Sequence, residues 1–295
     1  MNLSLSRSFP IAKAALAAAV IACVVALTCS LAGCASGGTG SSSADADNTS
    51  ASTDGKTLRV AMELAYPPFE TKDDAGNPEG LAVDFIRDFG AAYGYDVQIE
   101  NTAWDGLIPS LQSDKADLVI SSMTITDERK QSVDFSDAYA MAQLAILANA
   151  DSGVASIDDL NQPGKKVAVK TGSTGDVYAT KNLTNAEIVR LADESACVTE
   201  VVQGKADGFL YDQLTIYRNH QANPDTTEAV FIPFQDAEEW GIAVKKGDTE
   251  LLDQLNAFIA QSKTDGEFDR LTEKYLADEK KAFDQYGFKW FFDFE

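Results

Sequence analysis

The chain has 295 residues, 45% of them hydrophobic and 24% charged, which is enough for two modest domains with buried cores. Its 46 acidic residues outnumber its 24 lysines and arginines, and an acidic surface repels phosphate backbones, which argues against nucleic acid as a partner. Three of the four cysteines lie within the first 34 residues, and His220 is the single histidine. A disulfide framework and a cysteine- or histidine-based metal site are therefore excluded, and we expect no metal and no cofactor.

The first 33 residues have the order of a secretory signal peptide. Arg7 and Lys13 precede the apolar run 14–27, and small residues follow it. The run ends in Leu-Ala-Gly-Cys at Cys34, which resembles a bacterial lipobox and implies cleavage before Cys34 and acylation of its thiol. The alternative is an uncleaved membrane-spanning helix, since residues 14–34 approach the length needed to cross a bilayer.

Residues 35–55 contain Gly, Ser, Thr, Ala, Asn and Asp and no large apolar residue. Such a composition cannot bury enough surface to offset the entropy of ordering. We therefore expect a flexible, acylated linker over residues 34–56. It would anchor a folded domain to the extracytoplasmic face of the cell membrane, at the cell surface or in the periplasm.

From residue 57 onward, short apolar strands alternate with helical patterns, which is typical of an α/β fold with largely parallel sheets. A strand is predicted over 58–62. A helix follows in which Leu81, Phe85, Phe89 and Tyr93 recur every four residues. Asp105 is predicted to cap the next helix, and 118–120 to form a buried strand.

The same plan then repeats, with a strand over 166–170, a turn over 171–175, a helix from Asp176 and a strand over 209–211. Lys-Ala-Asp occurs at 115–117 and again at 205–207, each time between a helix end and a strand, which suggests two lobes built alike. A further strand is predicted over 240–245, followed by two helices. The last thirteen residues hold seven aromatic side chains, which we expect to pack against the chain's own domain.

Ligands of open parallel sheets lie at the carboxyl ends of the strands. Four predicted strand ends carry polar or aromatic residues: Glu63, Tyr66 and Phe69; Ser121, Ser122 and Thr124; Lys170; and Asp212. Arg129 lies in the first turn of a helix that Thr126 can cap, where a guanidinium could grip a carboxylate with two hydrogen bonds. The alternative is a solvated surface arginine, as most arginines are.

Three longer motifs carry a family resemblance. Tyr66-Pro67-Pro68-Phe69, the run from Trp104 to Pro109 and the run from Met123 to Ser136 resemble the polar amino acid-binding proteins of bacterial ABC importers. The similarity continues through Gly172-Ser173, the Lys-Ala-Asp of 205–207 and Asp212, and covers about 57–277.

The resemblance implies a bilobal type II periplasmic-binding fold, an α/β fold with two doubly wound sheets joined by a two-segment hinge. The hinge would lie near 139–143 and 234–238. Lobe 1 would then comprise 57–142 and 237–280, lobe 2 would comprise 143–236, and residues 281–295 would form an aromatic C-terminal tail.

The resemblance also implies roles for individual side chains. The α-carboxylate of the ligand would meet Arg129, Ser122, Thr124 and the backbone N–H groups near Ser173 and Thr174, and Asp212 would accept from the α-ammonium. Tyr66 and Trp104 would sandwich the ligand side chain, and Glu63 and Lys170 would line its far end. Trp104 could instead be a core aromatic, and Lys170 a solvated strand end.

These roles predict a monomeric binding protein, not an enzyme, that captures a free amino acid by lobe closure and delivers it to the permease of an ABC importer. If Glu63 and Lys170 cancel, the pocket has no net charge and favours a neutral polar side chain, with glutamine as the first candidate. If Lys170 turns away, lysine or arginine is favoured, and if Glu63 does, glutamate or aspartate. The rivals are a periplasmic dehydratase acting on prephenate or arogenate, and a surface adhesin or sensory module.

Overall fold

The structure is a computed structural model that describes residues 55–286 and 289–294. The predicted signal peptide over 1–33, the lipidation site at Cys34 and nearly all of the predicted linker lie outside these residues. The first strand starts at Lys56, the last residue assigned to the linker, because that residue already pairs with Tyr95. No helix in the described part of the chain has the length and apolar character needed to cross a membrane.

The first sheet has five strands in the order β4-β1-β5-β14-β6. Strand β1 pairs in parallel with β4 and β5, whereas β14 is antiparallel to both β5 and β6. We call this sheet and its helices lobe 1. Its elements are β1 (Lys56–Met62), β4 (Tyr95–Asn101), β5 (Leu118–Val119), β6 (Val133–Phe135), β14 (Ala243–Lys245), α1 (Leu81–Tyr93), α2 (Leu107–Gln112), α3 (Asp127–Lys130), α8 (Thr249–Ser262), α9 (Glu267–Tyr275) and α10 (Ala277–Tyr286).

The second sheet repeats this plan in the order β10-β9-β11-β8-β12, and with its helices it forms lobe 2. Strand β9 pairs in parallel with β10 and β11, and β8 is antiparallel to β11 and β12. Its elements are β8 (Leu144–Asn149), α4 (Ile157–Leu160), β9 (Lys166–Lys170), α5 (Thr174–Asn182), β10 (Glu187–Leu191), α6 (Glu194–Val202), β11 (Gly208–Asp212), α7 (Gln213–Ala222) and β12 (Thr227–Val230). The α/β class and the two lobes are confirmed, with antiparallel strands completing each sheet.

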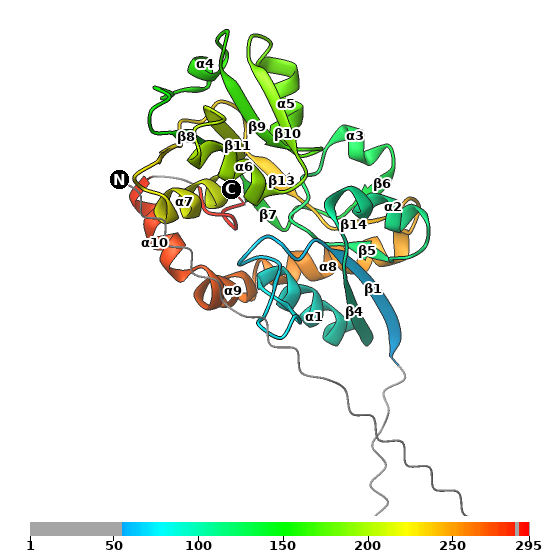
Figure 1. The fold of residues 1–295 in the computed structure, drawn as a ribbon. Helices are drawn as coiled ribbons and strands as arrows, with labels where there is room; N and C mark the ends of the chain where they lie inside the picture. The colour runs from blue at the N-terminus through cyan, green and yellow to red at the C-terminus, as the bar shows by residue number, and fades with distance from the viewer. Residues whose placement is uncertain (1–54, 287–288, 295) are drawn as a thin grey trace, which may run out of the picture. The chain divides into compact units, whose positions relative to one another are not determined.

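Two short antiparallel strands lie where the chain passes between the sheets: β7 (Ala140–Ala142) and β13 (Glu238–Trp240). Figure 1 shows the elements of lobe 1 and those of lobe 2 gathered around separate sheets, with β7 and β13 between them. A small hairpin, β2 (Thr71–Lys72) with β3 (Pro78–Glu79), precedes α1. The lobe boundaries at 142/143 and 236/237 stay predictions.

The repeated Lys-Ala-Asp motif has the same structural role in both lobes. Asp117 Oδ2 accepts the backbone N–H of Arg59 at 2.7 Å, and Asp207 Oδ2 accepts the backbone N–H of Lys166 at 2.8 Å. Each aspartate thereby holds the backbone of the corresponding parallel strand of its sheet, β1 in lobe 1 and β9 in lobe 2. The motif is thus a sign of two lobes built alike, as the sequence suggested.

Several predicted elements are corrected. Asp105 lies inside a short 3₁₀ turn (Trp104–Gly106) and gives α2 no side-chain cap. Helix α5 begins at Thr174 rather than at Asp176, because the Ser173 hydroxyl accepts the N–H of Asp176 and serves as the cap. The strand predicted over 240–245 is two strands, since Trp240 pairs with the hinge strand β7 while Ala243 pairs with lobe 1.

The aromatic C-terminal residues pack into the largest hydrophobic cluster. Phe283, Trp290 and Phe291 are buried there beside core residues of α1, α8 and α9. Helix α10 runs across the predicted boundary at 280/281, so the tail begins as a continuation of a helix. The expectation that these rings pack on their own domain is confirmed.

Candidate functional site

One pocket gathers the strand ends of both lobes, and about 480 Å³ of space there is free of atoms, including the open solvent at its mouth. Nine of the ten residues predicted for ligand binding line it, all except Lys170. Arg129 belongs to α3 of lobe 1 and Asp212 ends β11 of lobe 2, so the two predicted anchors share a cavity. The pocket is lined by Glu63, Tyr66, Glu70, Trp104, Ser121, Ser122, Thr124, Arg129, Leu144, Ser173, Thr174, Tyr211, Asp212, Glu238 and Trp240.

The Arg129 guanidinium is held by carbonyl groups of both lobes. Nη1 donates to the carbonyl of Thr124 at 2.6 Å and Nη2 to that of Gly172 at 3.2 Å, and the group lies 5.2 Å from the centre of the Trp104 ring. Among the described residues, no carboxylate lies within ion-pair distance of it. Burial lowers the pKa of Arg129, and the nearby Glu238 opposes that shift. A cation held this way is ready for an anionic partner from outside the chain.

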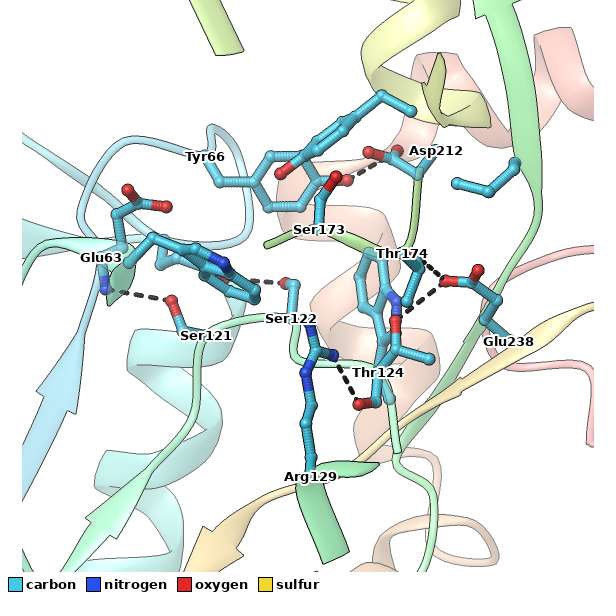
Figure 2. A pocket seen from close by; sticks show the side chains of 15 residues that line it. Glu63, Tyr66, Ser121, Ser122, Thr124, Arg129, Ser173, Thr174, Asp212 and Glu238 are labelled. Atoms are coloured by element: carbon cyan, nitrogen blue, oxygen red, sulfur yellow. Dashed lines mark hydrogen bonds between the residues drawn. The ribbon is translucent and has the colours of Figure 1, made fainter. Parts of the chain in front are cut away.

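Asp212 combines a cap with a cross-lobe contact. Its Oδ1 accepts the backbone N–H groups of Leu214 and Thr215 at the start of α7, and it also accepts the Tyr66 hydroxyl at 2.7 Å. Figure 2 shows the Tyr66 phenol pointing at this carboxylate. Burial raises the pKa of Asp212, while the Tyr66 hydrogen bond lowers it. The carboxylate is therefore fixed in position before any ligand arrives.

Lys170 and Glu63 form an ion pair across the lobes. The lysine is 4% exposed, so it is not a solvated strand end. Its Nζ also lies 5.1 Å from the centre of the Trp104 ring, which places Trp104 beside both Lys170 and Arg129. The mutual cancellation of Glu63 and Lys170, on which the charge count depended, is thus present in the structure.

Glu238 is a pocket carboxylate that the sequence did not single out. Its Oε2 accepts the hydroxyls of Thr124 at 2.9 Å and Thr174 at 2.7 Å, one from each lobe (Figure 2). Its Oε1 accepts the Gln235 amide at 2.7 Å. Burial raises the pKa of Glu238. The Thr124 hydroxyl, from a residue predicted to meet the ligand's carboxylate, is therefore bonded here to a carboxylate of the hinge strand, and so is the Thr174 hydroxyl, whereas the prediction near Thr174 concerned backbone N–H groups.

Glu70 is a second carboxyl that sequence reasoning missed. It is 1% exposed, and Ser122 Oγ donates to its Oε2 at 3.1 Å. Desolvation raises its pKa well above the usual range. Ser122 itself has a positive φ of 47°, a conformation that non-glycine residues adopt rarely and mostly at functional sites. In the described part of the chain, no lysine or arginine forms an ion pair with Glu70.

Glu194, at the start of α6, adds a further acidic group near the pocket. Burial, followed by the charge of Asp212, raises its pKa to about 7. Its side chain accepts a long 3.5 Å hydrogen bond from Asn219. The region therefore holds more carboxyl groups than cations.

Signals for the missed residues were present but incomplete. Glu70 directly follows the Tyr-Pro-Pro-Phe motif, and Glu238 lies in the segment predicted to cross between the lobes. Ser121 was predicted at a strand end without a role, and Tyr211 is the last residue of the strand predicted over 209–211; both line the pocket. Leu144, at the start of β8, and Trp240, in the hinge strand β13, carried no polar signal, and only the tertiary structure places them in the pocket.

Two sheets of like topology, a two-strand hinge and a polar pocket with groups from both lobes define a two-lobed ligand-binding protein. Residues 58–278 match the model of the bacterial extracellular solute-binding proteins, family 3. The chain belongs to this family, whose members are extracellular or periplasmic solute-binding proteins.

The individual relatives are named as amino acid-binding proteins. The chain is 37% identical over 258 residues to a probable histidine-binding protein of Neisseria gonorrhoeae, covering 86% of this chain and 94% of the relative. An ancestral arginine-binding protein, solved with arginine and also with glutamine, is 36% identical with a TM-score of 0.69, covering 75% of this chain and 98% of that one. An ancestral amino acid-binding protein described as a precursor of cyclohexadienyl dehydratase is 39% identical with a TM-score of 0.68, covering 74% and 94%.

Proposed function

We propose that this chain captures a free amino acid with a basic side chain between its lobes and delivers it to the permease of an ABC importer. The observation that carries the proposal is the placement of Arg129 and Asp212 in one pocket, each from a different lobe. The guanidinium would take the ligand's α-carboxylate and the carboxylate its α-ammonium. Because the ligand touches both lobes, it stabilises the closed form by its differential affinity for that form.

The acidic surplus supports a basic ligand. With Arg129 and Asp212 assigned to the zwitterion and Lys170 paired with Glu63, Glu70 and Glu238 remain as pocket carboxyls without an ion-pair partner among the described residues. Burial of such groups is unfavourable for their charged form, and a cationic side chain would offset that cost. Glutamine, favoured by the four-residue charge count, becomes the second candidate. An ancestral relative was solved once with arginine and once with glutamine, so glutamine is kept among the ligands to be tested.

The proposed ligand can be tested by measuring the melting temperature of the full-length chain in detergent with each of the twenty amino acids, since a tight ligand stabilises by mass action. Titration calorimetry then ranks arginine, lysine, histidine and glutamine. We expect the basic amino acids to bind most tightly. A preference for glutamine would mean that the charge count over Arg129, Asp212, Glu63 and Lys170 was sufficient to predict the ligand. Binding of none of the twenty amino acids would refute the proposed function.

The proposed role is binding rather than catalysis, in line with the names of the relatives. The rival function is that of a dehydratase, since one structural neighbour is described as a precursor of cyclohexadienyl dehydratase. Incubation with prephenate or arogenate separates the two, because a binding protein returns its ligand unchanged.

Anchoring through a lipid on Cys34 is part of the same proposal. It rests on the Leu-Ala-Gly-Cys order at the end of the apolar run. Mass spectrometry of the cell-derived protein should find Cys34 at the N-terminus with an acyl modification, and Cys34→Ser should release the protein from the membrane fraction.

A further inference from the structure

The C-terminal segment, residues 277–294 as far as they are described, has no part in the proposed function so far. The family match ends at residue 278, so almost all of this segment lies beyond the part shared with the family model. It nevertheless touches three parts of the molecule that matter for the pocket: the hinge, the aromatic floor of the pocket and helix α7 of lobe 2.

The first contact is with the hinge. The carbonyl of Phe291 accepts the backbone N–H of Met141, in hinge strand β7, at 2.7 Å. The Phe291 ring is fully buried, and its centre lies 5.5 Å from that of Trp240 in the other hinge strand, β13. The tail is therefore fastened to both strands about which the lobes would move.

The second contact is with the pocket floor. Trp240 lines the pocket directly. Phe291 also packs edge-on against Phe69 at 5.2 Å, and Phe69 stacks on Tyr66 at 5.6 Å. Tyr66 is the residue that donates to Asp212. Phe291 thus backs two pocket side chains without entering the pocket itself.

The third contact reaches lobe 2. The ring of Phe283 in α10 packs edge-on against Tyr217 of α7 at 5.8 Å, and Glu279 pairs with Arg218 of α7 at 3.6 Å. Helix α7 begins directly after Asp212, which caps it. Helix α10 packs on α9 of lobe 1, and Trp290 donates a hydrogen bond to Thr272 of α9 at 3.3 Å. We therefore expect α10 to move with lobe 1 and to lose its contacts with α7 if the lobes separated.

We propose that residues 277–286 and 289–294 form a strap that favours the closed arrangement of the lobes, with Phe291 as a positioning residue for the pocket floor. The proposal rests on the proposed function for its effect on ligand affinity. The strap is a link additional to the hinge strands, and its removal should shift the population toward the open form. Ligand affinity falls in proportion to the loss of the competent population.

Two matched pairs of variants test the strap. Phe291→Leu keeps an apolar side chain but alters the ring contacts with Trp240 and Phe69, and its control is Phe292→Leu, because Phe292 stacks on Phe268 in the lobe 1 core. Glu279→Lys reverses the charge that faces Arg218, and its control is Asp278→Lys on the same helix, where the side chain is 96% exposed. These substitutions keep the full chain, so the test does not depend on a truncated protein folding.

Two readouts are taken on the full-length chain: affinity for L-arginine, and hydrogen–deuterium exchange of the unliganded chain in residues 63–70 and in α7. We expect Phe291→Leu and Glu279→Lys to weaken arginine binding by about tenfold and to speed exchange in both segments, while the controls leave both readouts unchanged. The proposal would be wrong if both test variants kept the exchange rates and the arginine affinity of the wild type and showed only a lower melting temperature. If wild type binds no amino acid, the proposed function fails, and the exchange data alone still decide whether the strap holds the lobes together.

Discussion

The Tyr66 hydroxyl donates a 2.7 Å hydrogen bond to Asp212 Oδ1. The bond joins a loop of lobe 1 to the residue that caps helix α7 of lobe 2. The carboxylate predicted to bind the ligand's ammonium is therefore already oriented by three donors. A ligand would meet a fixed acceptor and would not pay for ordering it.

Asp212→Asn separates the charge of this group from its capping role. The amide oxygen can still accept from Leu214, Thr215 and Tyr66, but the negative charge is lost. We expect ligand binding to weaken by about 2–5 kcal/mol, because the α-ammonium would be buried without a counter-charge. Titration calorimetry measures the change, and Tyr66→Phe, which removes one hydrogen bond, should cost only about 1 kcal/mol. Equal losses in both variants would show that position, not charge, is what Asp212 supplies.

Arg129→Ala should also weaken binding by about 2–5 kcal/mol, since the ligand's α-carboxylate would lose its charged partner. The control is Lys130→Ala, the exposed neighbour on the same short helix. Calorimetry on both variants gives the comparison. Wild-type affinity in Arg129→Ala would remove the site assignment.

Glu70→Gln tests the preference for a basic side chain. Glu70 is buried without an ion pair among the described residues, and burial raises its pKa, so the neutral amide should raise the free energy of unfolding at pH 8. In the same variant we expect arginine affinity to fall by about tenfold, with glutamine affinity unchanged. Urea unfolding and calorimetry measure the two effects, with exposed Glu79→Gln as the control. A parallel loss for arginine and glutamine would count against a role in selectivity.

The pKa of Glu194, raised to about 7 by burial, predicts a pH dependence of stability. The folded chain keeps this proton between about pH 4.5 and 7, where the unfolded chain has released it, so the free energy of unfolding falls as pH rises through this window. Glu70, Asp212 and Glu238, whose pKa values are also raised by burial, act in the same direction. Urea unfolding at pH 4.5, 6 and 7.5 should show a shallower fall in Glu194→Gln than in wild type. Identical slopes would mean that Glu194 is solvated like an ordinary carboxyl.

Local signals in the sequence predicted much of the fold. The four-residue spacing of Leu81, Phe85, Phe89 and Tyr93 predicted the helix that the structure shows as α1, because helical periodicity is a property of neighbouring residues. Asp105 and Asp176 were misplaced because capping depends on which residue leaves the helical conformation first. The strand over 240–245 was predicted as one because its division depends on pairing with two distant partners, β7 and lobe 1.

For this protein, the sequence by itself determined the α/β class, the two like lobes and the residues at the strand ends, because propensity, periodicity and motif spacing are carried by short stretches of chain. Only the tertiary structure decided which charges meet. It paired Glu63 with Lys170, brought Glu238 of the hinge to the hydroxyls of Thr124 and Thr174, and buried Glu70. Burial and pairing set the cost of each charge, and both depend on residues that are far apart in the sequence.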